Sequence, residues 1–182
     1  MHGDDRDGNP IFWEQTGKSS HNYSSMLDDL TQDDMVSLHI RRQELMVRRI
    51  KDNSVRYGRS VEKFVVVSDL KGLTVSLDPA SMSMFLKLSA LDQASYPERL
   101  KKLFFINTPL YFTALWGLVW PFLHPTTVGK ITILGENFLP TLQEFIDDAS
   151  IPTEYGGTMI SSWNVPDNCP WDKPVSLFHC SK

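Results

Sequence analysis

The chain has 182 residues, of which 41% are hydrophobic and 22% are charged, which is enough apolar material for one globular domain with a sizeable core. Its formal net charge of −4 argues against nucleic acid as the main partner, because phosphate binding needs a concentrated basic surface. No apolar segment follows Met1, so we expect neither a secretory signal nor a membrane anchor, and a cytoplasmic location.

The first residues predict a turn, a short strand and a loop. Residues 3–10 are acidic, and Asp7-Gly8 predicts a turn directly before the strand Ile11-Phe12-Trp13. Residues 16–25 are rich in serine, glycine, asparagine and histidine, a composition that is typical of a loop.

A long helix is expected to follow. Thr31 with Asp34 three residues later resembles an N-cap, and the chain then lacks glycine and proline until Gly58. Arg42 and Arg49 fall on the apolar side of this helix, where they either extend along the edge of the core or reach a bound anionic group. Helical spacing gives that apolar side five further members: Met35, Leu38, Leu45, Met46 and Ile50.

Basic residues are concentrated in the same helix. Seven of the 18 lysines and arginines lie between residues 41 and 59. This concentration predicts either a patch that faces an anionic membrane or an ordinary solvated helix face.

The middle of the chain predicts a second strand and a second helix. Residues 64–67 are Phe-Val-Val-Val, a continuous apolar run that is typical of a strand covered on both faces. The turn at residues 69–72 ends the strand. Asp78-Pro79 then resembles an N-cap followed by proline in the first helical turn, and the apolar residues after it have helical spacing.

A strand, a wholly apolar helix and another strand come next. Residues 102–108 form a short β-favouring run, residues 109 to about 123 predict the helix, and a strand begins at Lys130. This order predicts parallel pairing of the two strands. Only Thr113 and Gly117 interrupt the apolar residues of the helix between Leu110 and Trp120, so it is either buried in the core or faces a lipid cavity, being too short to span a bilayer.

The C-terminal part predicts little further structure. A short helix follows Pro140 and ends between residues 144 and 148, and Gly156-Gly157 permits backbone conformations that other residues resist. The tail at residues 161–182 is expected to pack over the domain. Its two cysteines, at positions 169 and 180, do not form a metal-binding pattern and are expected to be free thiols.

Motifs of the common enzyme classes are absent from the sequence. The chain has no nucleophile elbow, phosphate-binding loop, dinucleotide fingerprint or zinc-binding helix. A domain with a large apolar helix and no catalytic constellation is better interpreted as a binding protein than as an enzyme, and we expect no cofactor and no metal.

An ordered set of motifs resembles the CRAL-TRIO lipid-binding domain, and within it the phosphatidylinositol transfer proteins. The motifs, read from residue 96 to residue 157, are Tyr96-Pro97-Glu98-Arg99, Ile106-Asn107-Thr108-Pro109, Trp120-Pro121-Phe122-Leu123, Thr127, Lys130-Ile131 and Glu154-Tyr155-Gly156-Gly157. The resemblance implies an α/β fold of three layers, with a mostly parallel β-sheet flanked by helices and an apolar lipid cavity closed by a gating helix. It implies a domain over residues 1–160, without the N-terminal helical lobe of that family, so the chain is either a fragment of a longer protein or a reduced form.

The resemblance also implies a set of site residues. The lipid headgroup would be held by Glu98, Thr127 and Lys130, the cavity wall would include Phe64, Val66 and Ser68, and Arg42 and Arg49 are candidates for contact with an anion. The gating helix and cavity would be formed by Tyr111, Phe112, Leu115, Trp116, Val119, Trp120 and Phe122.

The implied function is to hold one phospholipid, preferably phosphatidylinositol, and to exchange or present it during transient contact with a membrane surface. A lipid-regulated scaffold without net transfer, or a binder of another small hydrophobic ligand such as a sterol, remain alternatives. A second hydrophobic lipid is expected as an exchange partner. In the resembling proteins hydroxyl groups on the strand before residues 69–72 help hold a choline headgroup, whereas this chain has Phe64 and Val66 there, so phosphatidylcholine is not expected to be the second lipid in that way.

Overall fold

The computed structural model describes residues 3–17, 31–73 and 79–160, with twelve named elements of secondary structure. Their order is β1 (Ile11–Glu14), α2 (Gln32–Tyr57), β2 (Phe64–Asp69), α3 (Pro79–Ser95), β3 (Leu100–Ile106), α4 (Leu110–Val119), η1 (Trp120–Phe122), α5 (Pro125–Val128), β4 (Ile131–Ile133), α6 (Leu139–Gln143), η2 (Asp148–Ser150) and η3 (Thr153–Tyr155).

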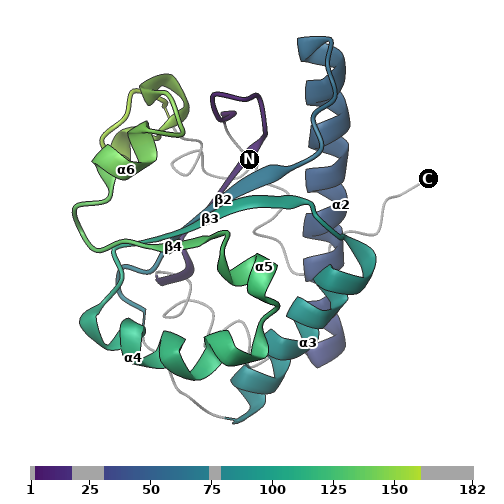
Figure 1. Cartoon of the computed structure of the whole chain (residues 1–182), viewed down its shortest axis with the longest axis vertical. Helices are drawn as coiled ribbons and strands as arrows, with labels where there is room; N and C mark the ends of the chain where they lie inside the picture. Colours follow the sequence, from purple (N-terminus) through teal and green to yellow (C-terminus); the bar gives the residue numbers. More distant parts are fainter. Residues whose placement is uncertain (1–2, 18–30, 74–78, 161–182) are drawn as a thin grey trace.

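Four strands form one parallel sheet in the order β1-β2-β3-β4, as the sequence of strand, helix and strand predicts. A helix connects each strand to the next. Figure 1 shows α3 and α4 below the sheet and α6 above it. The expected α/β architecture of a parallel sheet flanked by helices is confirmed.

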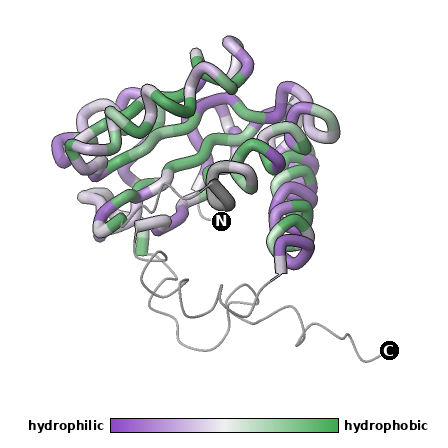
Figure 2. The backbone as a smooth tube through the Cα atoms, turned by 90° about the horizontal axis from the view of Figure 1, so that it is seen from below, coloured by the Kyte–Doolittle hydropathy of each residue, from purple (hydrophilic) through white to green (hydrophobic). Residues whose placement is uncertain are grey.

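The two faces of the sheet carry alternate residues of each strand. We call one the α6 face; it carries Val65 and Val67 of β2 and their neighbour Phe104 of β3. The other is the α4 face; it carries Val66 and its alternates on β2, with Phe105 of β3 next to Ser68. Figure 2 shows the strands coloured as hydrophobic along most of their length, because both faces are largely apolar.

The α6 face is closed by the main hydrophobic core. Ile11, Phe104 and Ile106 are fully buried there, and the segment after β4 covers them with Leu142 and Ile146, which are also fully buried. Trp13 adds a stack with Tyr155, whose ring centroid is 5.3 Å away. The described residues therefore close this side of the sheet with packed side chains.

The long helix α2 begins as the sequence predicts. The Thr31 hydroxyl accepts from the Asp34 amide, the Asp34 carboxylate accepts from the Thr31 amide, and Gly58 ends the helix in the left-handed conformation. The buried residues of α2 lie between Gln43 and Asn53, and among them Met46 and Ile50 form a core cluster with Val61 and Phe64.

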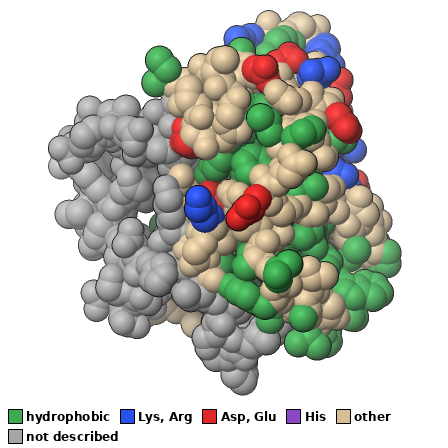
Figure 3. Space-filling view, turned by 90° about the vertical axis from the view of Figure 1, so that its left-hand side faces the viewer, with side chains coloured by type: hydrophobic (Ala, Val, Ile, Leu, Met, Phe, Trp, Pro, Cys, Tyr) green, Lys and Arg blue, Asp and Glu red, His purple; other side chains and the backbone are tan. Residues whose placement is uncertain are grey.

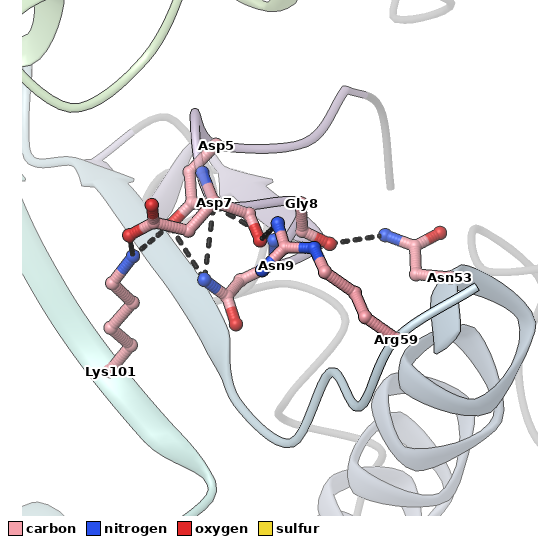
Figure 4. A network of polar contacts seen from close by, with 7 residues as sticks. All are labelled: Asp5, Asp7, Gly8, Asn9, Asn53, Arg59 and Lys101. Carbon is pink, nitrogen blue, oxygen red and sulfur yellow. Dashed lines mark hydrogen bonds and ion pairs between the residues drawn. The ribbon is translucent and has the colours of Figure 1, made fainter. Parts of the chain in front are cut away.

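The N-terminal turn is fixed to this framework by polar contacts (Figure 4). Lys101 donates to Asp5 and to Asp7, at 2.6 Å each, and the Asn53 amide of α2 donates to the Gly8 carbonyl at 2.9 Å. Burial lowers the pKa of the Lys101 ammonium, but the hydrogen bonds to the two carboxylates outweigh it and leave the pKa raised. The turn predicted at Asp7-Gly8 is confirmed, and this network of polar contacts fixes the turn to β3 and α2.

Several predicted boundaries shift. β3 begins at Leu100 instead of residue 102 and ends at Ile106. The apolar helix has two parts, because α4 ends at Val119 and a 3₁₀ turn that contains Pro121 follows. The prediction that the last helix ends between residues 144 and 148 was wrong: α6 ends at Gln143. Asp78, the two cysteines and the tail at residues 161–182 lie outside the described residues.

Candidate functional site

The α4 face differs from the α6 face in how completely it is covered. Ile11 and Phe104 on the α6 face are fully buried, whereas their strand neighbours Phe12 and Phe105 on the α4 face are only partly buried. The same partial burial is found for a row of apolar side chains across this face: Val66, Leu103, Ile131 and Ile133. Both faces of the sheet are therefore apolar, but the α6 face is fully covered and the α4 face is only partly covered.

The helix α4 lies across this surface without being buried. No residue of α4 or η1 is buried, although every residue except Thr113 and Gly117 is apolar. The rings of Phe112 and Trp116 contact Phe105 of the sheet, with centroid distances of 5.3 and 6.1 Å. The alternative that this helix is an ordinary buried core helix is therefore wrong.

The outer side of α4 and η1 is an exposed apolar ridge. The exposed fractions are 98% for Leu110, 58% for Leu118 and 68% for Phe122. Figure 3 shows hydrophobic side chains gathered on the lower part of the molecule, where α4 lies in Figure 1. An apolar surface of this kind on a helix is typical of a segment that meets a partner or a lipid surface.

The residues expected in the gating helix divide between these two sides. Phe112 and Trp116 contact the sheet, and like Leu115 and Val119 they are partly buried, while Tyr111, Trp120 and Phe122 are exposed. The Tyr111 hydroxyl donates to the carbonyl of Leu73, which connects α4 to the turn after β2.

The expected wall residues Phe64, Val66 and Ser68 share the α4 face but differ in access. Phe64 packs into the cluster with Met46 of α2, and the Ser68 hydroxyl forms a 2.7 Å hydrogen bond with the Thr16 hydroxyl and is almost fully buried. Val66 between them is partly exposed. Of the three, Val66 is thus the residue with surface left to offer a ligand.

The three expected headgroup residues lie together at the amino ends of β3 and β4. Lys130 Nζ donates to Glu98 Oε2 at 3.0 Å, and the Lys130 amide donates to the Thr127 carbonyl at 3.0 Å. Glu98 has a left-handed backbone, with φ of 59°, which is uncommon for a residue with a side chain. The short helix α5 places Thr127 in this group and His124 caps that helix.

Positive charge surrounds the Glu98 carboxylate. The hydrogen bond from Lys130 lowers the pKa of Glu98 below its usual range, the charge of Lys130 adds to this, and Lys63 and His124 contribute in the same direction. Sequence reasoning missed Lys63 and His124. No sequence signal marks Lys63, which comes close only because β2 and β3 are neighbours, and His124 stands out only by following the apolar helix.

The two arginines on the apolar side of α2 already have protein partners. Arg42 pairs with Glu14 at 3.2 Å and lies over the Phe12 ring, with the guanidinium carbon 5.1 Å from the ring centroid. Arg49 lies 3.7 Å from Asp4. These contacts favour the first interpretation, in which the arginines extend along the edge of the core.

A cavity of about 550 Å³ lies away from α4, beside the N-terminal turn. Arg6 pairs with Asp147 at 3.0 Å in its lining, and Arg56 pairs with Asp4 at 3.3 Å. Because its lining is charged and internally paired, this cavity does not suit an apolar ligand. Among the described helices, none is both long enough and apolar enough to cross a bilayer, and no cluster of metal-ligating side chains occurs in the described part of the chain.

Comparison with known proteins places this geometry in a family. The family model described as "CRAL/TRIO domain" matches residues 1–157. The SEC14 cytosolic factor of Kluyveromyces lactis is 35% identical over 157 residues, an alignment that covers 86% of this chain and 52% of that protein. The phosphatidylinositol/phosphatidylcholine transfer protein SFH11 of Arabidopsis thaliana is 31% identical over 180 residues, covering 96% of this chain and 47% of the relative.

A solved structure agrees with the fold. The crystal structure of Sfh5 superposes with a TM-score of 0.63 at 23% identity, over 87% of this chain and 53% of that one. The chain spans about half the length of the curated relatives it matches. The matched family model, the relatives and the parallel sheet agree, and the chain belongs to the CRAL-TRIO family.

Proposed function

We propose that this domain binds one phospholipid between the α4 face of the sheet and the helix α4, favours phosphatidylinositol, and exchanges or presents it at membranes. The observation that carries the proposal is the contrast between the two faces of the sheet, one closed by fully buried residues and the other apolar but incompletely covered. The names of the relatives, which include transfer proteins for phosphatidylinositol and phosphatidylcholine, support it.

The physical chemistry of lipid transfer calls for a surface of this kind. A diacyl lipid has on the order of 30 methylenes, and exposing them to water costs roughly 0.8 kcal/mol each, or about 25 kcal/mol in total. A protein that carries a lipid must therefore receive the acyl chains on an apolar surface. The partly buried apolar side chains on the α4 face of the sheet, among them Phe12 and Ile133, offer that surface. The helix α4 covers it without a buried side chain of its own.

We assign the lipid headgroup to Glu98, Thr127 and Lys130. Lys130 would donate to the phosphate, and Glu98 would accept from hydroxyls of the inositol ring. Their mutual ion pair is weak in the free protein because the Glu98 side chain is 68% exposed. A ligand can therefore replace it at little cost in free energy.

Membrane contact would be made by α4 and η1. Their exposed apolar ridge matches the lipid interface, so the protein would act in the cytoplasm and bind membranes peripherally and transiently. The basic stretch of α2 is a weaker candidate for this role, because Arg42, Arg49 and Arg56 in it pair with carboxylates of the protein itself.

We expect phosphatidylcholine to compete weakly for the site. Phe64 packs in the core cluster, the Ser68 hydroxyl bonds to Thr16, and Val66 has no donor, so this strand offers a choline phosphate no free hydroxyl. An unpaired buried phosphate loses about 1–3 kcal/mol, which is roughly 5- to 100-fold in affinity. In displacement of labelled phosphatidylinositol from the loaded protein, phosphatidylcholine should be that much weaker than unlabelled phosphatidylinositol.

The matched variant for this expectation is Val66→Thr, which adds a hydroxyl of nearly the same volume to the α4 face. It should bring phosphatidylcholine closer to phosphatidylinositol in the competition. Equal displacement by the two lipids in the parent protein would contradict the expectation.

Transfer between vesicles tests the proposed function. Donor vesicles with labelled phosphatidylinositol should lose label to acceptor vesicles when the protein is added, without catalytic change to the lipid. Binding without transfer would favour a lipid-regulated scaffold, and loading with a sterol in place of phospholipid would favour the other alternative. Both outcomes would contradict phospholipid transfer as the function.

A further inference from the structure

A buried polar cluster lies at the carboxyl ends of the strands, away from the headgroup residues. The carboxylate of Asp69, which is 4% exposed, accepts from the Asn107 side-chain amide at 2.8 Å and from the Lys71 backbone amide at 2.9 Å. The Tyr155 hydroxyl donates to its second oxygen at 3.1 Å. Burial and the neighbouring Asp69 charge raise the pKa of Tyr155, so its hydroxyl remains a donor.

Asn107 occupies a special position in this cluster, because it lies between β3 and α4. Its backbone is left-handed, with φ of 51°, a conformation that asparagine tolerates better than most residues with a side chain. The backbone amide of Asn107 donates to the Gly135 carbonyl at 3.3 Å. The next residue, Thr108, donates its backbone amide and its hydroxyl to the Leu134 carbonyl, at 3.1 and 2.8 Å. The direction in which the chain enters α4 is therefore set at Asn107.

The apolar helix beyond this point is held at its two ends, and also by the bond from the Tyr111 hydroxyl to the Leu73 carbonyl and by the contacts of the Phe112 and Trp116 rings with Phe105. No side chain between Leu110 and Phe122 is buried, and the next buried residue is Leu123, which is 7% exposed. A stiff helix with firm ends and weak contacts between them moves as one body when a fixed end is loosened. The firmness of the Asn107 end therefore controls how readily α4 leaves the sheet.

We propose that the hydrogen bond from Asn107 to Asp69 is the pivot of α4, and that it sets how fast lipid enters and leaves. Asn107 is thus a positioning residue, and the inference rests on the proposed function of lipid transfer. In this proposal the bond is made in the free and in the lipid-bound protein, so weakening it speeds loading and release alike and changes the bound fraction little.

Two single variants break the bond in different ways. Asn107→Gly removes the side chain and leaves a residue that accepts the left-handed backbone without strain. Asn107→Asp keeps the shape but places a second carboxylate against Asp69. Both should speed phosphatidylinositol exchange between vesicles roughly tenfold, since a hydrogen bond to a charged group contributes at least that factor to an equilibrium, with an unchanged bound fraction at equilibrium. Asn107→Gly should melt within a few degrees of the parent, whereas Asn107→Asp should melt lower because it adds a second carboxylate beside the buried Asp69.

A double variant separates the pivot from a general loss of structure. Asp69→Asn combined with Asn107→Asp exchanges the two groups, so an amide faces a carboxylate again. Exchange should return part of the way toward the parent rate, because the Asp69 oxygen that Asn107 reaches also accepts from the Lys71 backbone amide, and the swap loses that bond. Gln143→Ala is the control, because it removes an amide-to-carboxylate bond of the same length, to Asp148, on the other side of the sheet. It should exchange lipid at the parent rate.

Hydrogen exchange at the Asn107 and Thr108 backbone amides distinguishes a wrong pivot from a wrong function. If the parent chain carries no lipid, the proposed function fails, yet these amides should still exchange faster in both single variants and recover in the double variant. The pivot would be overturned if both single variants exchanged lipid and amide hydrogens at the rates of the parent. It would also be overturned if the double variant exchanged lipid as fast as the single variants do.

Discussion

Replacing Trp116 by aspartate is expected to abolish phospholipid loading while the fold survives. The Trp116 ring lies 6.1 Å from the Phe105 ring, so a carboxylate there would face the apolar surface that receives the acyl chains. A polar group left without a partner in such a site costs about 2–7 kcal/mol, and each 1.4 kcal/mol is tenfold in affinity. Loading should therefore fall by at least about 25-fold, as measured by lipid extracted from the purified protein.

The fold should tolerate this change because no residue of α4 is buried. Thr113→Asp is the control, since it puts the same charge on an exposed position of the same helix; it should load lipid as the parent does. An unfolded Trp116→Asp protein would mean that α4 is needed for the core, and normal loading would mean that α4 does not cover the ligand.

Replacing Lys130 by alanine is expected to weaken phosphatidylinositol selectively. A hydrogen bond to a charged group contributes roughly 1.5–3 kcal/mol, so the preference for phosphatidylinositol over a ligand without a phosphate, such as a sterol, should fall by about ten- to a hundredfold. Glu98→Ala should act in the same direction through the ring hydroxyls. Competition between labelled phosphatidylinositol and other lipids measures this preference.

Lys87→Ala controls for the loss of one positive charge, because Lys87 is exposed on α3 and belongs to none of the proposed binding residues. It should leave the preference unchanged. Folding should survive in all three variants, since the Glu98–Lys130 pair is solvent-accessible on the Glu98 side. Equal loss of every lipid in Lys130→Ala would refute the assignment of the headgroup.

Local signals in the sequence predicted the framework well. The apolar run at residues 64–67 identified the strand β2, and Thr31 with Asp34 identified the start of α2, because both signals lie in neighbouring residues. The order of elements then led to the parallel sheet. The family resemblance was stated from ordered motifs and is confirmed by the matched family model.

Several features that depend on contacts between distant residues were not predicted, although the family resemblance did bring Glu98 and Lys130 together. The apolar composition of α4 left burial and exposure both open, and the answer depends on how much of the helix the sheet covers. Asp69 forms hydrogen bonds with Asn107, which lies 38 positions later in the sequence, and with Tyr155, which lies 86 positions later. No local sequence pattern reveals such bonds. The sequence could not predict whether Arg42 contacts the protein or an anion, because its partner Glu14 lies 28 residues earlier, on another element.

The claim that this domain holds a lipid is tested most directly by native mass spectrometry of the purified chain. The proposal predicts a second species, heavier than the protein by the mass of one phospholipid, that releases phosphatidylinositol when activated in the gas phase. In the Trp116→Asp variant this species should be lost. A parent spectrum that contains only the bare protein, after expression and purification in the presence of phosphatidylinositol, would contradict the proposal.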